Sequence, residues 1–330
     1  MTTHRRLFDR IVPDKFILWM IAAVIAASLI PATGAAAVLV DYATLAAIFA
    51  LFFLHGVRLP REALVAGIVD WRLHAAILAS TFLICPSAGF ALATMFPGLL
   101  PPALWTGILF LCALPSTVQS SIAFTSMAGG NVAGAVAAAA ASNLLGVFLT
   151  PALVSLMLST RGAEVAWSGI GKVAGLLFLP FVLGHLLRPW LFPLVASRPR
   201  LTVAVDKGTI LLAVYGAFSA AMVDGLWRRI APHEILLLTV TCLLLLGIIL
   251  AATTLIGRAG YSRENRAAIL FCGSVKSLAS GIPMARILFP GAAAGLVILP
   301  VMLFHAFQLI VCAWIAARLA RQNSPAAVSA

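Results

Sequence analysis

The sequence predicts an all-α polytopic membrane protein with ten transmembrane helices, arranged as two inverted five-helix repeats. Of its 330 residues 62% are hydrophobic and only 10% are charged, with a mean hydropathy of +1.09, whereas a soluble domain carries about 25% charged residues. The apolar residues fall into ten stretches close to the roughly 20 residues that cross a bilayer. Two stretches carry polar islands at corresponding places in the two halves, 1–160 and 161–330, a pattern typical of inverted repeats in transporters.

The ten spans are predicted from the apolar stretches in chain order. Prolines such as Pro31, Pro97 and Pro290 lie at or near the proposed ends, where a residue without an N–H stops a helix. The predicted spans are 16–31, 36–55, 73–96, 103–128, 132–159, 170–188, 205–223, 234–256, 267–289 and 292–320.

The distribution of basic residues predicts the orientation of these spans. Most of the 22 Lys and Arg residues fall in loops on one side, the side that carries both chain termini. Because basic loops resist translocation, this side is expected to be cytoplasmic, in an integral protein of the bacterial inner membrane. The net charge of +12 is therefore an orientation signal. We expect no nucleic-acid partner, since the charge forms no basic face or tail.

Two polar islands, residues 114–121 and 273–281, interrupt predicted spans four and nine. An unpaired backbone amide in hydrocarbon costs several kcal/mol, so such islands are tolerated only where they face protein or a watery cavity. A shift of 157 positions aligns Thr117 with Ser274 and Gln119 with Lys276. The sequence therefore predicts that helices four and nine are broken and that their breaks form one site.

Hydroxyl groups dominate the predicted site. In a broken helix, free carbonyls and hydroxyls can coordinate a cation, and free amides suit an anion. The alternative for each hydroxyl is a hydrogen bond within its own helix or to a neighbour. The hydroxyls concerned are Ser116, Thr117, Ser120, Ser121, Ser274, Ser277 and Ser280.

Lys276 is the single residue for which the sequence most specifically predicts a functional role. A lysine near the middle of a span costs on the order of 3 kcal/mol and is seldom kept without a role or a partner. It could be a fixed positive charge, a proton-binding group or a counter-ion for an anionic substrate. Snorkelling to an interface is the structural alternative. No carboxylate lies in the middle of a span to pair with Lys276. Asp41, a few residues inside span two, is a better candidate partner than Glu264 at the entry of span nine; the alternative is that Asp41 only marks the outer interface.

Other polar residues within the spans are expected to play smaller parts. Asn143 and Gln119 are candidate site members, whereas Asn131 and Gln308 are expected to hydrogen-bond between helices. The histidines and the five cysteines show no metal-ligand spacing, so no metal centre is predicted from them. The histidines in or near the spans are His55, His185 and His305.

Two long motifs carry a family resemblance. Residues 115–132, with the sequence PSTVQSSIAFTSMAGGNV, and residues 271–285, FCGSVKSLASGIPMA, are similar to the bile acid:sodium symporter-like branch of the sodium/bile acid cotransporter superfamily. The resemblance implies ten helices, with broken helices four and nine crossing. It also implies a core of helices 3–5 and 8–10, about residues 73–159 and 234–320, and a panel of helices 1, 2, 6 and 7.

The sequence departs from this family pattern where classical members hold two sodium ions. The helix-nine glutamate is replaced by Phe271 or Cys272, the glutamine by Val275 and its neighbouring asparagine by Lys276. Thr81 stands at the helix-three glutamine. We therefore expect the ammonium of Lys276 to stand in for a bound sodium, since two sodium ions beside it would be strongly repelled.

The helix-five hydroxyls of the pattern align with alanines, while Ser142 and Asn143 lie one turn further on. Ser142 and Thr81 are therefore further candidate contributors to the site. Coupling is then expected to protons, to one weak sodium at Ser120, Ser121 and Asn143, or to no ion. No other cofactor is expected.

The predicted function is secondary active transport of a small organic anion by alternating access. Two alternatives are a channel and a regulatory membrane protein that transports nothing. A third is an intramembrane hydrolase that uses Ser274 and Lys276 as a nucleophile pair, although residues two apart on a helix point to different faces. We expect a transporter and no enzyme, and the sequence does not predict an oligomeric state.

Overall fold

The computed structural model describes residues 15–59, 70–160, 174–225, 230–289 and 291–322. These ranges contain helices and one isolated bridge, and no strand, which confirms the all-α prediction. Six of the described helices are long and apolar enough to cross a membrane, and a bent pair adds a seventh. Three shorter apolar helices lie among them.

The described part of the first half contains three long helices, Gly34–Arg58, Trp71–Met95 and Val132–Ser159, and several shorter ones. Helix α2 is only 15 residues long, and the helix formed by α5, η1 and α6 runs unbroken over Trp71–Met95 with a π-helical turn inside it. The elements are α2 (Lys15–Leu29), α3 (Gly34–Arg58), α5 (Trp71–Ala79), η1 (Ser80–Ile84), α6 (Cys85–Met95), α7 (Pro102–Ala113), α8 (Gln119–Met127) and α9 (Val132–Ser159).

The second half also combines long and interrupted helices. Its elements are η2 (Ala174–Phe178), α11 (Leu179–Leu186), α12 (Arg188–Ala196), α13 (Pro199–Val223), α14 (Pro232–Arg258), α15 (Arg263–Ser274), α16 (Leu278–Leu288) and α17 (Ala293–Gln322). Spans four and nine of the prediction are each two helices separated by a break, α7 with α8 and α15 with α16.

The predicted sixth span, 170–188, differs from the structure. The helix turns by 90° after Leu186 and continues as α12, a helix that lies between the predicted spans 170–188 and 205–223. Pro189 lies in the first turn of α12, where no N–H is needed within the helix. Residues 170–173 lie outside the described ranges.

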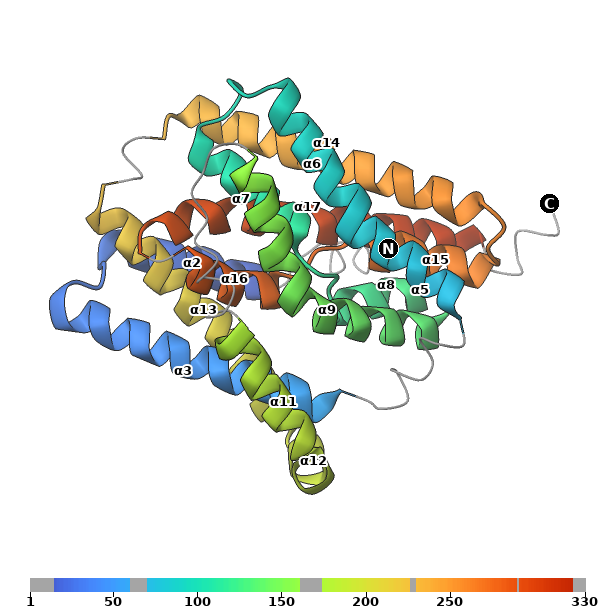
Figure 1. Cartoon of the computed structure of the whole chain (residues 1–330), viewed down its shortest axis with the longest axis horizontal. Helices are drawn as coiled ribbons and strands as arrows, with labels where there is room; N and C mark the ends of the chain where they lie inside the picture. Colours follow the sequence, from blue (N-terminus) through green and yellow to red (C-terminus); the bar gives the residue numbers. More distant parts are fainter. Residues whose placement is uncertain (1–14, 60–69, 161–173, 226–229, 290, 323–330) are drawn as a thin grey trace, which may run out of the picture.

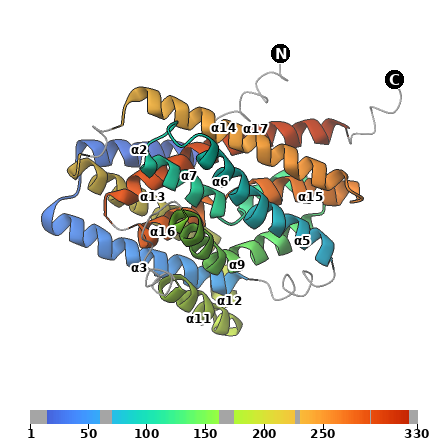
Figure 2. The same cartoon turned by 45° about the horizontal axis from the view of Figure 1, so that its top comes forward.

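The described helices contact one another in two groups. Helices α2, α3, α11, α12 and α13 pack together, and α5–α9 pack with α14–α17. Helix α13 contacts both α16 and α17 and so links the groups. Figures 1 and 2 show α3, with α11 and α12, on the side of the molecule opposite α14.

Two glycines permit the close packing of α3 against α11. A Cβ atom at Gly56 would overlap the carbonyl of Phe181, and one at Gly184 would overlap the carbonyl of Phe53. Helices in membranes gain stability from such close backbone approach, because apolar side chains gain little by leaving lipid.

Candidate functional site

The breaks in the two interrupted helix pairs meet. Residues 114–118 separate α7 from α8, and residues 275–277 separate α15 from α16. An antiparallel bridge joins Ser116 to Lys276, and the Ser277 amide donates to the Pro115 carbonyl over 2.8 Å. The 157-position shift aligned Lys276 with Gln119. In the structure Lys276 instead pairs with Ser116, three residues earlier in the chain.

The two breaks have different local causes. Pro115 has no N–H and disfavours helical geometry at the residue before it, and Leu114 is accordingly extended, with φ −67° and ψ 149°. The second break contains no proline. Val275 is extended there (φ −88°, ψ 127°), and the Ser277 side chain caps α16 by accepting from the Ser280 amide over 3.2 Å, a common way to restart a helix.

Side chains from the next long helix satisfy the exposed peptide groups of each break. In the first break, the Ser116 amide donates to Ser142 Oγ (3.0 Å) and Asn143 Nδ2 donates to the Ser116 carbonyl (2.7 Å). In the second, the Lys276 amide donates to Gln308 Oε1 (2.8 Å) and Gln308 Nε2 donates to the Lys276 carbonyl (2.9 Å). Backbone groups at membrane depth therefore find protein partners, as they must without water.

The Lys276 side chain is buried, at 2% exposure. Its Nζ donates to three main-chain carbonyls, those of Thr81 (2.8 Å), Cys112 (2.8 Å) and Leu114 (2.9 Å). An ammonium has three N–H donors, so all three are used. We call these three oxygens the carbonyl cradle; such oxygens are also the ligands that hard cations prefer.

If α7 continued as a regular helix, a backbone amide would bond to one of these carbonyls. In a regular α-helix the amide of residue 116 would bond to the Cys112 carbonyl. The Ser116 amide instead bonds to Ser142, which leaves Cys112 available to Lys276.

The expectation that Asp41 pairs with Lys276 is wrong. Asp41 forms its ion pair with Arg286 of α16, and its side chain is 61% exposed. A carboxylate near the first turns of α3 remains in a polar environment, whereas the buried ammonium is stabilised by carbonyl dipoles.

The predicted hydroxyls gather around the breaks. Ser121 Oγ lies 3.3 Å from Ser116 Oγ and 3.4 Å from Thr117 Oγ1, and Thr117 also contacts Ser120. Ser280 Oγ donates to Asn143 Oδ1 over 2.6 Å and lies 3.1 Å from Ser277 Oγ. These hydroxyls and the Asn143 amide form one network across both breaks.

Three predicted residues take other positions. Gln119 is exposed at the start of α8. Ser274 Oγ donates to the Leu270 carbonyl of its own helix over 2.5 Å, so Ser274 and Lys276 are engaged separately and form no nucleophile pair. Thr81 contributes its carbonyl, because its hydroxyl donates to the Ile77 carbonyl.

Gln308 is the site residue whose role the sequence reading underestimated. Its expected hydrogen bonding between helices is confirmed, as is that of Asn131, which donates to Asn265 over 2.8 Å. The sequence signal for a site role was an amide residue in the middle of an apolar span, a placement that favours function, and the structure shows that its side chain is fully buried. His305 Nδ1 lies 2.7 Å from Gln308 Nε2.

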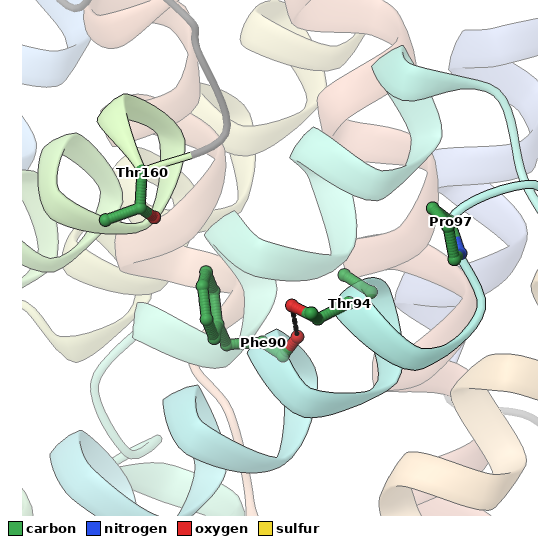
Figure 3. Close-up of a pocket in the computed structure, with 5 residues that line it drawn as sticks. Phe90, Thr94, Pro97 and Thr160 are labelled. Carbon is green, nitrogen blue, oxygen red and sulfur yellow. Dashed lines mark hydrogen bonds between the residues drawn. The ribbon is translucent and has the colours of Figure 1, made fainter.

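A surface hollow of about 330 Å³ lies away from the breaks. Phe90, Ala93, Thr94, Pro97 and Thr160 line it, at the ends of α6 and α9. Figure 3 shows the Thr94 hydroxyl turned to the Phe90 carbonyl, to which it donates over 2.8 Å. The lining contains no charged group, and within the described residues no three or more His, Cys, Asp or Glu side chains form a metal-binding group.

Membrane-length helices around a buried ammonium and a hydroxyl network define an integral membrane protein of the transporter class. The family model of the SBF-like CPA transporter family (DUF4137) matches residues 14–321, and the chain belongs to this family. The family resemblance seen in the two motifs is thereby confirmed.

Relatives extend over nearly the whole chain. The chain is 48% identical to "Uncharacterized protein PA2026" of Pseudomonas aeruginosa, over 97% of both chains. It is 46% identical to "Putative symporter YfeH" of Escherichia coli, over 94% of both. It is 26% identical to "Sodium/bile acid cotransporter 7" of Rattus norvegicus, over 92% of both. Family and relatives indicate a membrane transporter or symporter and no enzyme.

Proposed function

We propose that this protein is a secondary transporter of a small organic anion that works by alternating access. Its ten spans form two inverted five-helix repeats, residues 1–160 and 161–330. The core contains residues 73–159 and 234–320, and helices 1, 2, 6 and 7 form the panel. The two helix groups described above support this division, because contacts within each group are continuous and α13 forms the main link between them.

The repeated construction of the breaks supports the inverted repeat. In each half, an interrupted helix pair is followed by a long helix, α9 or α17, whose polar side chains bind the peptide groups of the break. Interrupted helices of this kind mark the substrate and ion sites of transporters built from repeats.

The observation that carries the proposed mechanism is the carbonyl cradle around Lys276. We infer that this ammonium takes the place of a coupling sodium ion. Two unit charges 4 Å apart repel by about 4 kcal/mol at an effective dielectric constant of 20, which weakens binding about a thousandfold. The same repulsion weakens sodium binding at Ser120, Ser121 and Asn143 by an amount that falls with the distance from Lys276 Nζ, and we therefore favour coupling to protons or to no ion.

Of the three roles considered for Lys276, the fixed positive charge fits best. A counter-ion for the substrate would need a free N–H, and all three are engaged with carbonyls. Substrate recognition then falls to the hydroxyl network and to the first turn of α8, where Gln119 and Ser120 are at least partly exposed. Free amides in a first helical turn favour an anion, and the rat relative is named for bile acid, an organic anion.

We further propose that the protein lies in the bacterial inner membrane with both termini in the cytoplasm. Two closely similar relatives are bacterial. Arg58, Arg72, Arg258 and Arg263 lie at helix ends that belong to the same predicted side, as the preference of basic loops for the cytoplasm requires.

Flux measurements in proteoliposomes test the proposal. We expect saturable uptake of one organic anion from a panel, accelerated by unlabelled anion on the opposite side, and unchanged when choline replaces sodium. Conductance without saturation would indicate a channel, and absence of flux across the panel would favour a regulatory protein. Steep sodium dependence with two ions per turnover would contradict the role given to Lys276.

A further inference from the structure

One oxygen of the carbonyl cradle comes from a π-helical turn. In η1 the Cys85 amide donates to the Ser80 carbonyl, five residues back, so it is not available to Thr81, four residues back. The next amide along the chain would be that of residue 86, which is a proline and has no N–H. Neither of the two usual helical donors can therefore reach the Thr81 carbonyl, which accepts from Lys276 Nζ.

Pro86 also accounts for the π turn itself. A proline ring inside a helix collides with the carbonyl four residues earlier, here that of Phe82, and a widened turn relieves the collision. The second described π-helical segment shows the same spacing. Segment η2 ends at Phe178 and Pro180 follows two residues later, just as η1 ends at Ile84 and Pro86 follows two residues later.

We propose that Pro86 is a positioning residue, which keeps the Thr81 carbonyl free of main-chain donors so that it completes the carbonyl cradle of Lys276. The inference rests on the proposed role of Lys276 as a fixed cation. The π turn moves no charge and binds no ligand; its effect is to leave one acceptor unpaired at the position that the ammonium reaches.

Replacing Pro86 by alanine restores an N–H at residue 86. In the π turn this N–H reaches the Thr81 carbonyl, and in a regular α turn the Cys85 amide reaches it instead. In both geometries the Thr81 carbonyl is shared between a main-chain donor and Lys276 Nζ, which weakens its bond to the ammonium. In a Lys276→Met background, by contrast, the Thr81 carbonyl has lost its ammonium partner, and the new donor pairs a buried acceptor.

The experiment is a double-mutant cycle on thermal unfolding of the full chain in detergent or nanodiscs. We expect Pro86→Ala to lower the Tm of the wild type by several degrees, and to leave unchanged or raise the Tm of Lys276→Met. Residues in direct contact show such coupling, whereas distant sites give additive effects. Pro180→Ala is the matched control, since it alters the equivalent π turn away from Lys276, and its effect should be equal in both backgrounds.

Equal decreases for Pro86→Ala in both backgrounds would overturn the proposal, because Pro86 would then act only on the helix. If Pro86→Ala alone gives no folded protein, the double variant decides. A Tm at or above that of Lys276→Met supports the proposal, and a lower one contradicts it.

A second readout is labelling of Lys276 by an amine-reactive probe, followed by mass spectrometry. We expect several-fold faster labelling in Pro86→Ala than in wild type or Pro180→Ala, and equal rates would count against the proposal. Neither measurement uses a substrate. A chain that fails to transport an anion can thus still show the coupling, and the two failures are distinguishable.

Discussion

The two breaks that meet at the site differ in their unpaired hydrogen-bonding groups. The first, residues 114–118, contains Pro115 and leaves carbonyls at Cys112 and Leu114 without helical donors. The second, residues 275–277, contains no proline and brings three additional N–H groups on the Lys276 ammonium. The first break therefore has surplus acceptors and the second has surplus donors. Their difference shows that the crossing is stabilised by exchange between the halves and that neither break would be satisfied alone.

The largest loss of stability is expected from removing the Lys276 ammonium, which donates to the three carbonyls. Lys276→Ala leaves three buried carbonyls without a partner, each costing about 1–3 kcal/mol, so stability should fall by at least about 3 kcal/mol. Carbonyl oxygens favour a hard cation, and sodium should then raise the Tm of Lys276→Ala but not that of the wild type. Thermal unfolding in NaCl and in choline chloride at equal ionic strength measures this. If sodium leaves the Tm of Lys276→Ala unchanged, this contradicts the proposal that the Lys276 ammonium takes the place of a sodium ion.

The next largest losses of stability are expected from replacing the side chains that bind the peptide groups of each break. Gln308→Leu leaves both peptide groups of Lys276 unpaired and should cost about 2–6 kcal/mol, since each buried orphan costs about 1–3. Asn143→Leu removes the partners of the Ser116 carbonyl and of the Ser280 hydroxyl, and it should cost less because Asn143 is only half-buried and Ser280 keeps its contact with Ser277. Chemical or thermal denaturation of both variants checks the order. A larger cost for Asn143→Leu would show that the first break carries more of the stability.

A smaller effect is expected at the cap that restarts the second helix. Ser277→Ala removes the side-chain acceptor for the Ser280 amide and should cost about 1 kcal/mol. Ser274→Ala is the neighbouring comparison, because its hydroxyl donates to the Leu270 carbonyl of its own helix and caps no helix start, so it should cost less than Ser277→Ala. If Ser274→Ala abolished flux while Ser277→Ala did not, a chemical role for Ser274 would return.

The smallest effect is expected at the ion pair between Asp41 and Arg286. Asp41→Asn should cost about 0–1 kcal/mol, because water and salt screen the Asp41 carboxylate, which is 61% exposed although the Arg286 side chain is only 9% exposed. Denaturation at low and at high salt measures the difference, which should shrink as salt increases. A cost comparable with that of Lys276→Ala would mean that the pair holds the two helix groups together.

Much of the fold followed from composition and periodicity. The helical class, most span positions and the interruption of spans four and nine were predictable because a bilayer demands apolar length and penalises unpaired backbone groups. Helix α12 was not predictable, since a proline that usually ends a helix can also begin one. The partner of Lys276 was misjudged for a related reason: a sequence displays carboxylates as the evident counter-charges, whereas carbonyl groups occur at every residue.

The sequence by itself determined that Lys276 and the two polar islands must face protein or a watery cavity. A charged side chain and unpaired backbone groups are both costly in hydrocarbon. Only the tertiary structure decided what they touch. The cradle is built from carbonyls on two separate helices, freed by Pro86, by the first break and by Ser142 taking the Ser116 amide. Whether a carbonyl is free depends on where its usual donor has gone, and that is settled by the packing of helices distant in the chain.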